Sequence, residues 1–124
     1  MSFLHEIERL ANHARVAMES TRDAIEFAVH RDGVDVRIRV APDVLEWSVE
    51  AVDQATGAQA SERWDYTGYD DCTRSELEAS LLEDLSEFMH GVAEKRLRFP
   101  DGEPRLEWET DGVWSQAVPF YFPM

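Results

Sequence analysis

Cysteine and lysine are almost absent from this sequence. Among 124 residues there is a single cysteine, Cys72, and a single lysine, Lys95. One cysteine cannot form an internal disulfide, so we expect a reducing compartment and a cytoplasmic location. Chemistry that requires a lysine would have to depend on Lys95 alone.

Several signatures of binding and catalysis are also missing. The six glycines are scattered and none precedes a lysine, which excludes a P-loop and a dinucleotide-binding fingerprint. There is no Gly-x-Ser-x-Gly elbow. No apolar run approaches the roughly 18 residues of a membrane span. The first twenty residues are acidic and amphipathic, so we expect no signal peptide.

Histidines and the cysteine lack the short spacings of a metal site. The four histidines are His5, His13, His30 and His90. We therefore predict no metal, no cofactor and no catalytic residue, and we expect that the protein is not an enzyme. A small enzyme that pairs Cys72 with a histidine stays an alternative, because a thiol beside a helix start can have a lowered pKa.

Positive charge is scarce. Asp and Glu number 26 against 12 Lys and Arg, which gives a formal net charge of −14. Residues 41–90 carry thirteen of these acids, with Arg63 and Arg74 as the only bases. Such a chain lacks the basic stripe that nucleic-acid phosphates or an anionic membrane surface require. It can attract a basic protein, or its charge can serve solubility alone.

Hydrophobic spacing predicts the first half of the fold. A helical stripe covers about residues 3–19. The pattern then alternates over 25–29 and 34–40, and the Asp32-Gly33 pair between these runs predicts a hairpin. Further strands are expected over 45–51 and 58–66. Glu62 interrupts the apolar face of the last one, which is typical of an edge strand.

The second half is predicted to be one long helix followed by two strands. Residues 73–76 match a capping box that opens a helix over about 74–96. Strands follow over 105–109 and 113–118. We expect one α+β domain over residues 1–124, in the order α-β-β-β-β-α-β-β. Its antiparallel sheet would have about four to six strands, with both helices on one face. The sequence leaves the strand order open.

Candidate contact residues fall in two places. Glu46 and Glu50 would lie on the uncovered sheet face. The segment 64–71 combines three aromatic residues with three acids, and aromatic residues are frequent interface anchors. Alternation favours Trp64 and Tyr66 as core residues instead. The partner-binding residues that we predict are Glu46, Glu50, Asp65, Tyr69, Asp70 and Asp71.

These features favour a non-enzymatic protein that binds and neutralises a basic protein partner. In size and charge the chain resembles the small acidic immunity proteins of bacterial toxin systems, although no motif carries the resemblance. Two alternatives remain open: a dimeric chaperone of a secreted effector, and a nucleic-acid mimic that inhibits a DNA-binding protein. The protein could act as a monomer or as a homodimer.

Overall fold

The structure, a computed structural model, describes residues 3–14, 16–20, 23–66 and 71–117. The helices are α1 (Phe3–Ala14) and α2 (Arg74–Glu94), with two 3-10 turns, η1 (Pro42–Val44) and η2 (Pro100–Gly102). The strands are β1 (Ala17–Ser20), β2 (Ile25–Arg31), β3 (Val34–Ala41), β4 (Glu46–Asp53), β5 (Gln59–Asp65), β6 (Leu97–Arg98), β7 (Glu107–Thr110) and β8 (Val113–Gln116).

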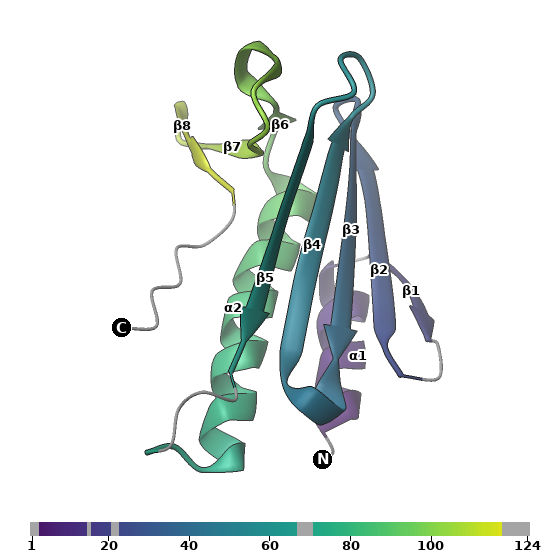
Figure 1. Cartoon of the computed structure of the whole chain (residues 1–124), viewed down its shortest axis with the longest axis vertical. Coiled ribbons are helices and arrows are strands. Elements are labelled where there is room, and N and C mark those ends of the chain that lie inside the picture. Colours follow the sequence, from purple (N-terminus) through teal and green to yellow (C-terminus); the bar gives the residue numbers. More distant parts are fainter. Residues whose placement is uncertain (1–2, 15, 21–22, 67–70, 118–124) are drawn as a thin grey trace.

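The strands form two antiparallel sheets (Figure 1). The first contains β1 to β5 in chain order, and the second contains β6 to β8. The predicted fold class is confirmed: an N-terminal helix, a long central helix and antiparallel sheets. Because strand order in each sheet follows chain order, strands that are neighbours in a sheet are also consecutive along the chain.

The hairpin of β2 and β3 shows why the alternating pattern predicts these strands. Asp32 and Gly33 both have positive φ, 54° and 74°, as a two-residue hairpin turn with the matching twist requires. The turn fixes the register, in which Val29 faces Val36 and Phe27 faces Ile38. Apolar side chains therefore share one face of the sheet, and polar ones share the other.

The first helix is shorter than predicted. The sequence predicts a helix to about residue 19, but α1 ends at Ala14, and residues 17–20 form β1 against β2. The amide of Val16 donates to the carbonyl of Ala11 and closes the helix. Short apolar runs fit both periods. Pairing of Met18 opposite Phe27 with the otherwise free side of β2 decides in favour of the strand.

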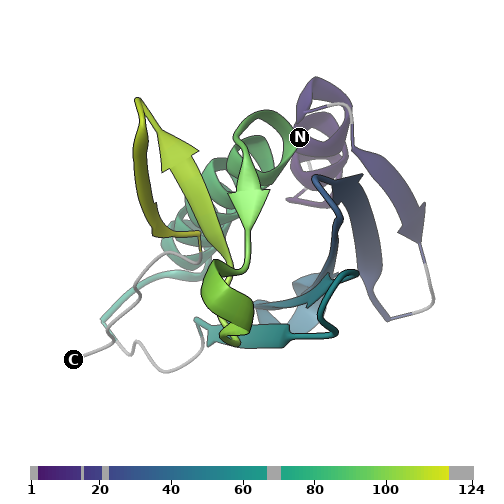
Figure 2. The same ribbon diagram turned by 90° about the horizontal axis from the view of Figure 1, so that it is seen from above.

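The apolar core lies between the five-stranded sheet and the two helices. Figure 2 shows strands β1 to β5 as an arc along one side of α1 and α2. Trp47 of β4 is 1% exposed and stacks on Trp64 of β5, with ring centroids 4.1 Å apart. Phe88 of α2 contacts both Trp47 and Trp108, so one aromatic cluster joins the two sheets through α2.

Glycine in α2 allows the second sheet to pack closely. A Cβ atom at Gly91 would lie 2.1 Å from the Cζ3 atom of Trp108, far inside van der Waals contact. The indole of Trp108 therefore occupies the space where any other residue would place its side chain. This approach brings β7 against α2 without an intervening layer.

Strand β5 forms one edge of the five-stranded sheet, as the sequence predicts. Glu62 is exposed and has the same side-chain direction as Trp64, toward the apolar side. Two copies of β5 that paired in antiparallel fashion around Glu62 would place two carboxylates opposite each other. Like charges in that position are destabilising, so Glu62 protects this edge from pairing.

The tip of the β2–β3 hairpin is tied to the end of α2. The Arg31 guanidinium donates to the carbonyls of Val92 and Lys95, both at 2.9 Å. Asp32 accepts a hydrogen bond from the Leu97 amide at 3.0 Å. A cation at the C-terminus of a helix also interacts favourably with the helix dipole. These contacts fix where the chain leaves α2 for the second sheet.

The predicted capping box at the start of α2 is confirmed. The Glu76 amide donates to Thr73 Oγ1 at 3.2 Å, and the Thr73 amide donates to the Glu76 carboxylate at 3.4 Å. Thr73→Ala should lower the free energy of unfolding by about 1 kcal/mol, because one amide loses its acceptor. Urea denaturation monitored by circular dichroism would measure this loss. Ser75→Ala, a neighbouring exposed substitution, should change stability little; equal effects would contradict a capping role for Thr73.

Candidate functional site

The outer face of the five-stranded sheet is the side away from α1 and α2 (Figures 1 and 2), and its side chains are exposed or half-buried. Strict alternation along the strands directs its side chains outward, as the exposure pattern of β3 and β4 shows. We define this outer face by the side chains of Glu19, Glu26, Ala28, His30, Asp35, Arg37, Arg39, Glu46, Ser48, Glu50, Val52, Gln59, Ser61, Arg63 and Asp65.

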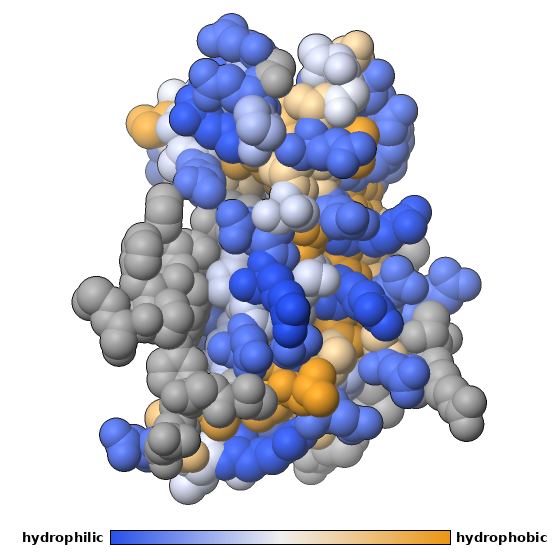
Figure 3. All heavy atoms as spheres, in the orientation of Figure 1, coloured by the Kyte–Doolittle hydropathy of each residue, from blue (hydrophilic) through white to orange (hydrophobic). Residues whose placement is uncertain are grey.

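Carboxylates and guanidinium groups are interleaved on the outer face. Arg37 of β3 lies opposite Glu50 of β4, and Arg39 lies opposite Glu26 of β2. Side chains in such cross-strand positions are direct neighbours. The carboxylates of this face outnumber its three arginines, so it stays acidic overall. Figure 3 shows hydrophilic side chains over β3 to β5.

Three of the predicted contact residues come together on this face. Glu46 and Asp65 are partners across β4 and β5, and Glu50 lies further along β4. Arg63 forms an ion pair with Glu46. The hydrogen bond to Glu46 and its charge raise the pKa of Arg63 above its ordinary value, with a smaller contribution from Asp65. Arg63 therefore reduces the repulsion between two carboxylates that the sheet register places side by side.

The outer face has broad, shallow hollows. One of them has a volume of about 640 Å³ and is lined mainly by Arg37, Arg39, Ser48, Glu50 and Arg63. Small-molecule pockets of similar size are usually lined by apolar and aromatic side chains. Apart from Val49, this hollow is lined by charged and hydroxyl-bearing residues, so its chemistry suits the polar surface of another protein better.

The other predicted contact residues lie elsewhere. Asp71 is exposed in the turn that precedes α2. Tyr69 and Asp70 lie outside the described residues. Cys72, next to Asp71, is exposed.

The aromatic residues of segment 64–71 that the structure describes belong to the core. Trp64 is 6% exposed and Tyr66 is 1% exposed. The Tyr66 hydroxyl accepts a hydrogen bond from Trp47 Nε1 at 2.9 Å and donates to Asp84 at 2.7 Å. Their alternation predicts this burial, and these two side chains are not available as interface anchors.

The acidic stretch 41–90 is divided between two surfaces. Glu46, Glu50 and Asp65 belong to the outer face, whereas Glu83 and Glu87 are exposed along α2. Arginines from outside the stretch, Arg37 and Arg39, lie among the sheet carboxylates. The excess of −11 along the sequence therefore does not form a single patch.

The candidate contact residues do not include every charged residue of the outer face. Arg63 and Glu26 were not among the candidate residues, although alternation through 25–31 and 58–66 places both on the same side as Glu46 and Glu50. The sequence signal that finds Arg63 and Glu26 is the alternation of side chains along each strand, compared across all the strands of the sheet. Arg37 and Arg39, by contrast, are expected on this face once the hairpin is assigned.

The described residues contain neither a cluster of metal ligands nor a membrane-spanning helix. No group of three or more His, Cys, Asp or Glu side chains that could hold a metal ion occurs in residues 3–14, 16–20, 23–66 and 71–117. Nor does any helix within these ranges have the length and apolar character needed to cross a membrane.

Comparison with protein-family models, curated proteins and solved structures finds no match to this chain.

Proposed function

We propose that the protein binds a basic protein partner through the outer face of its five-stranded sheet and thereby neutralises that partner. The observation that carries this proposal is the outer sheet face, on which six carboxylates lie among three guanidinium groups. The net charge of −14 adds a long-range attraction for a basic partner.

Specificity would come from the arginines within this acidic face. A partner that docks here must place cations over Glu26, Glu50 and their neighbours, and must avoid placing cations over Arg37 and Arg39. Like charges in contact across an interface cost several kcal/mol of binding free energy, and this cost disfavours a partner docked in the wrong alignment. The interleaved pattern therefore selects both the partner and its orientation, beyond simple attraction between opposite charges.

Glu50 is the most central acidic contact that we assign. It is exposed on β4, which is an inner strand, with Arg37 on one side and Ser61 on the other. Residues near the centre of an interface contribute most when water is excluded around them. Glu46 is the first residue of β4 and Asp65 is the last residue of β5, so both lie at one end of the sheet and we assign them weaker contacts.

The proposal is tested by removing two charges from the outer face. Glu26→Gln with Glu50→Gln leaves the Arg63–Glu46 ion pair in place. We expect partner affinity to fall about tenfold, because each exposed ion pair contributes up to about 1 kcal/mol. The partner would first be isolated on immobilised wild-type protein from the native host. Surface plasmon resonance with the purified partner would then measure affinity at several salt concentrations.

A matched control separates this face from net charge. Glu83→Gln with Glu87→Gln removes two carboxylates from the exposed side of α2 and gives the same net charge. At physiological salt the Debye length is about 8 Å, so distant carboxylates contribute little to contact energies. Affinity should stay within about twofold of wild type. Equal losses in both variants, or a loss only in the α2 variant, would overturn the assignment of the outer face.

A further inference from the structure

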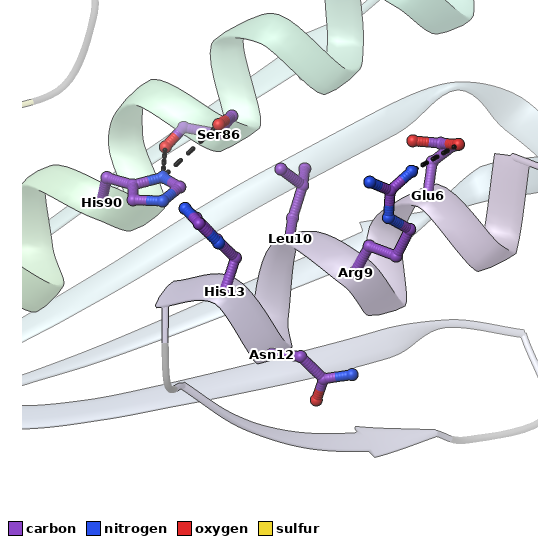
Figure 4. Close-up of a pocket in the computed structure, with 7 residues that line it drawn as sticks. All are labelled: Glu6, Arg9, Leu10, Asn12, His13, Ser86 and His90. Carbon is purple, nitrogen blue, oxygen red and sulfur yellow. Dashed lines mark hydrogen bonds and ion pairs between the residues drawn. The ribbon is translucent and has the colours of Figure 1, made fainter.

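A second hollow lies on the helical side of the molecule, between α1 and α2. It has a volume of about 710 Å³, and its lining includes Glu6, Asn12, His13, Ser86 and His90. Figure 4 shows the imidazoles of His13, from the last turn of α1, and His90, from α2, pointing toward each other. Their ring centroids are 5.3 Å apart, with the ring planes inclined at 58°.

The hydrogen bonds of His90 leave one ring nitrogen available as a ligand. Its Nδ1 lies 2.8 Å from the carbonyl oxygen of Ser86. A carbonyl only accepts hydrogen bonds, so Nδ1 carries the proton and Nε2 keeps its lone pair. Histidines that bind metals characteristically donate their other N–H to a backbone carbonyl or a carboxylate, which fixes the ring orientation.

The separation of the two rings fits coordination of a single ion. A metal–nitrogen bond of about 2.1 Å places the ring centre about 3.2 Å from the ion. Two such rings at a tetrahedral angle would have centroids about 5.2 Å apart. The observed distance is 5.3 Å. The separation of the two ring centres is therefore compatible with coordination of one ion by both rings.

We propose that His13 and His90 form a site for a divalent transition-metal ion that bridges α1 and α2. Imidazole suits copper, nickel and zinc. The observed spacing is that of tetrahedral Zn²⁺, whereas Cu²⁺, first in the order of intrinsic affinity, prefers tetragonal geometry. Water would complete the coordination sphere, since the described residues contribute no third His, Cys, Asp or Glu ligand to such a group. The negative net charge of the protein favours accumulation of cations near its surface. This site is independent of the outer face and of the function proposed for it.

Metal titration of the full chain tests the site. CuCl₂, NiCl₂ and ZnCl₂ would each be titrated into metal-free protein by isothermal titration calorimetry. We expect one ion per chain, Cu²⁺ as the tightest, and a loss of affinity of about tenfold or more in both His13→Ala and His90→Gln. His90→Gln keeps a long polar side chain in the partly buried position and protects the fold. The melting temperature should rise with Cu²⁺ in the wild type and not in these variants.

His30→Ala is the matched control, because His30 belongs to the outer face and contacts Asp35 there. It should leave the affinity for Cu²⁺ unchanged. Electron paramagnetic resonance of the Cu²⁺ complex should show two imidazole nitrogens in the wild type and fewer in His13→Ala. Unchanged binding in both His13→Ala and His90→Gln, an equal loss in His30→Ala, or no binding by the wild type would overturn the proposal.

Discussion

Gly91→Ala should destabilise the protein by about 2 kcal/mol, although alanine is the better helix former. A β-carbon at this position would lie 2.1 Å, 2.5 Å and 2.6 Å from three atoms of the Trp108 ring. Overpacking of this kind costs about 1–3 kcal/mol, and the upper end applies because a whole indole must move. The gain in helix propensity offsets about 1 kcal/mol of that cost.

Trp108 is buried, so it has little room to move. It is 7% exposed, contacts Phe88 with ring centroids 5.9 Å apart, and lies beneath the Lys95 ammonium at 4.5 Å. Urea denaturation of Gly91→Ala and of the wild type would measure the change in the free energy of unfolding, and thermal denaturation would measure the shift in melting temperature.

Introducing Gly91→Ala into a Trp108→Leu protein tests whether contact with Trp108 causes the loss of stability. In Trp108→Leu the ring atoms that meet the new methyl group are gone, so Gly91→Ala should become neutral or stabilising, by up to about 1 kcal/mol. Each background is compared with its own parent, so the cost of Trp108→Leu itself does not enter. If Gly91→Ala destabilises both backgrounds equally, the close approach of Trp108 is not the reason for glycine here.

Tyr66→Phe should lower the free energy of unfolding by about 1–3 kcal/mol, the penalty for a buried donor left without an acceptor. The Trp47 indole N–H donates to the Tyr66 hydroxyl, and both residues are 1% exposed. Phenylalanine fills the same space but offers no oxygen, and water cannot reach the indole N–H. Tryptophan fluorescence during urea denaturation would measure the loss.

Trp47→Phe supplies the control for the hydrogen bond. It removes the donor, so Tyr66→Phe should cost less in this background than in the wild type. A double-mutant cycle over the two positions gives the coupling free energy directly. A coupling indistinguishable from zero would show that Tyr66 stabilises the protein through packing or through its bond to Asp84 instead.

The elements that the sequence predicts well are those whose signals are local. The Thr73–Glu76 capping box and the Asp32-Gly33 turn each act within a few residues, so their outcome does not depend on distant parts of the chain. Strand β1 is different, because residues 16–20 fit a helix and a strand equally. Pairing with the side of β2 that β3 leaves free decides in favour of a strand for this segment. The role of Gly91 could not be predicted from the sequence for the same reason, because it depends on contact with Trp108 of β7.

The outer face could be predicted in part. Alternation places Glu46, Glu50, Arg37 and Arg39 on one side of the sheet, and the structure brings them together. The charge total of residues 41–90 was a poorer guide. A count along the chain adds strand and helix carboxylates that lie on different surfaces, and it leaves out arginines from β3. The pair formed by His13 and His90 has no signature in sequence spacing, because its members come from two helices 77 positions apart.

The order of strands in the first sheet has a kinetic consequence. Each of β2 to β5 pairs with its neighbour along the chain, so the loops that must close are short and the entropy of closure is small. Proteins rich in such local pairings fold faster than sandwiches with distant partners. One long-range step is the binding of Arg31 to the carbonyl groups at the end of α2, which joins residues 61 and 64 positions apart. We therefore expect the β2–β5 meander to form early, and the docking of α2 with the second sheet to limit the rate of folding.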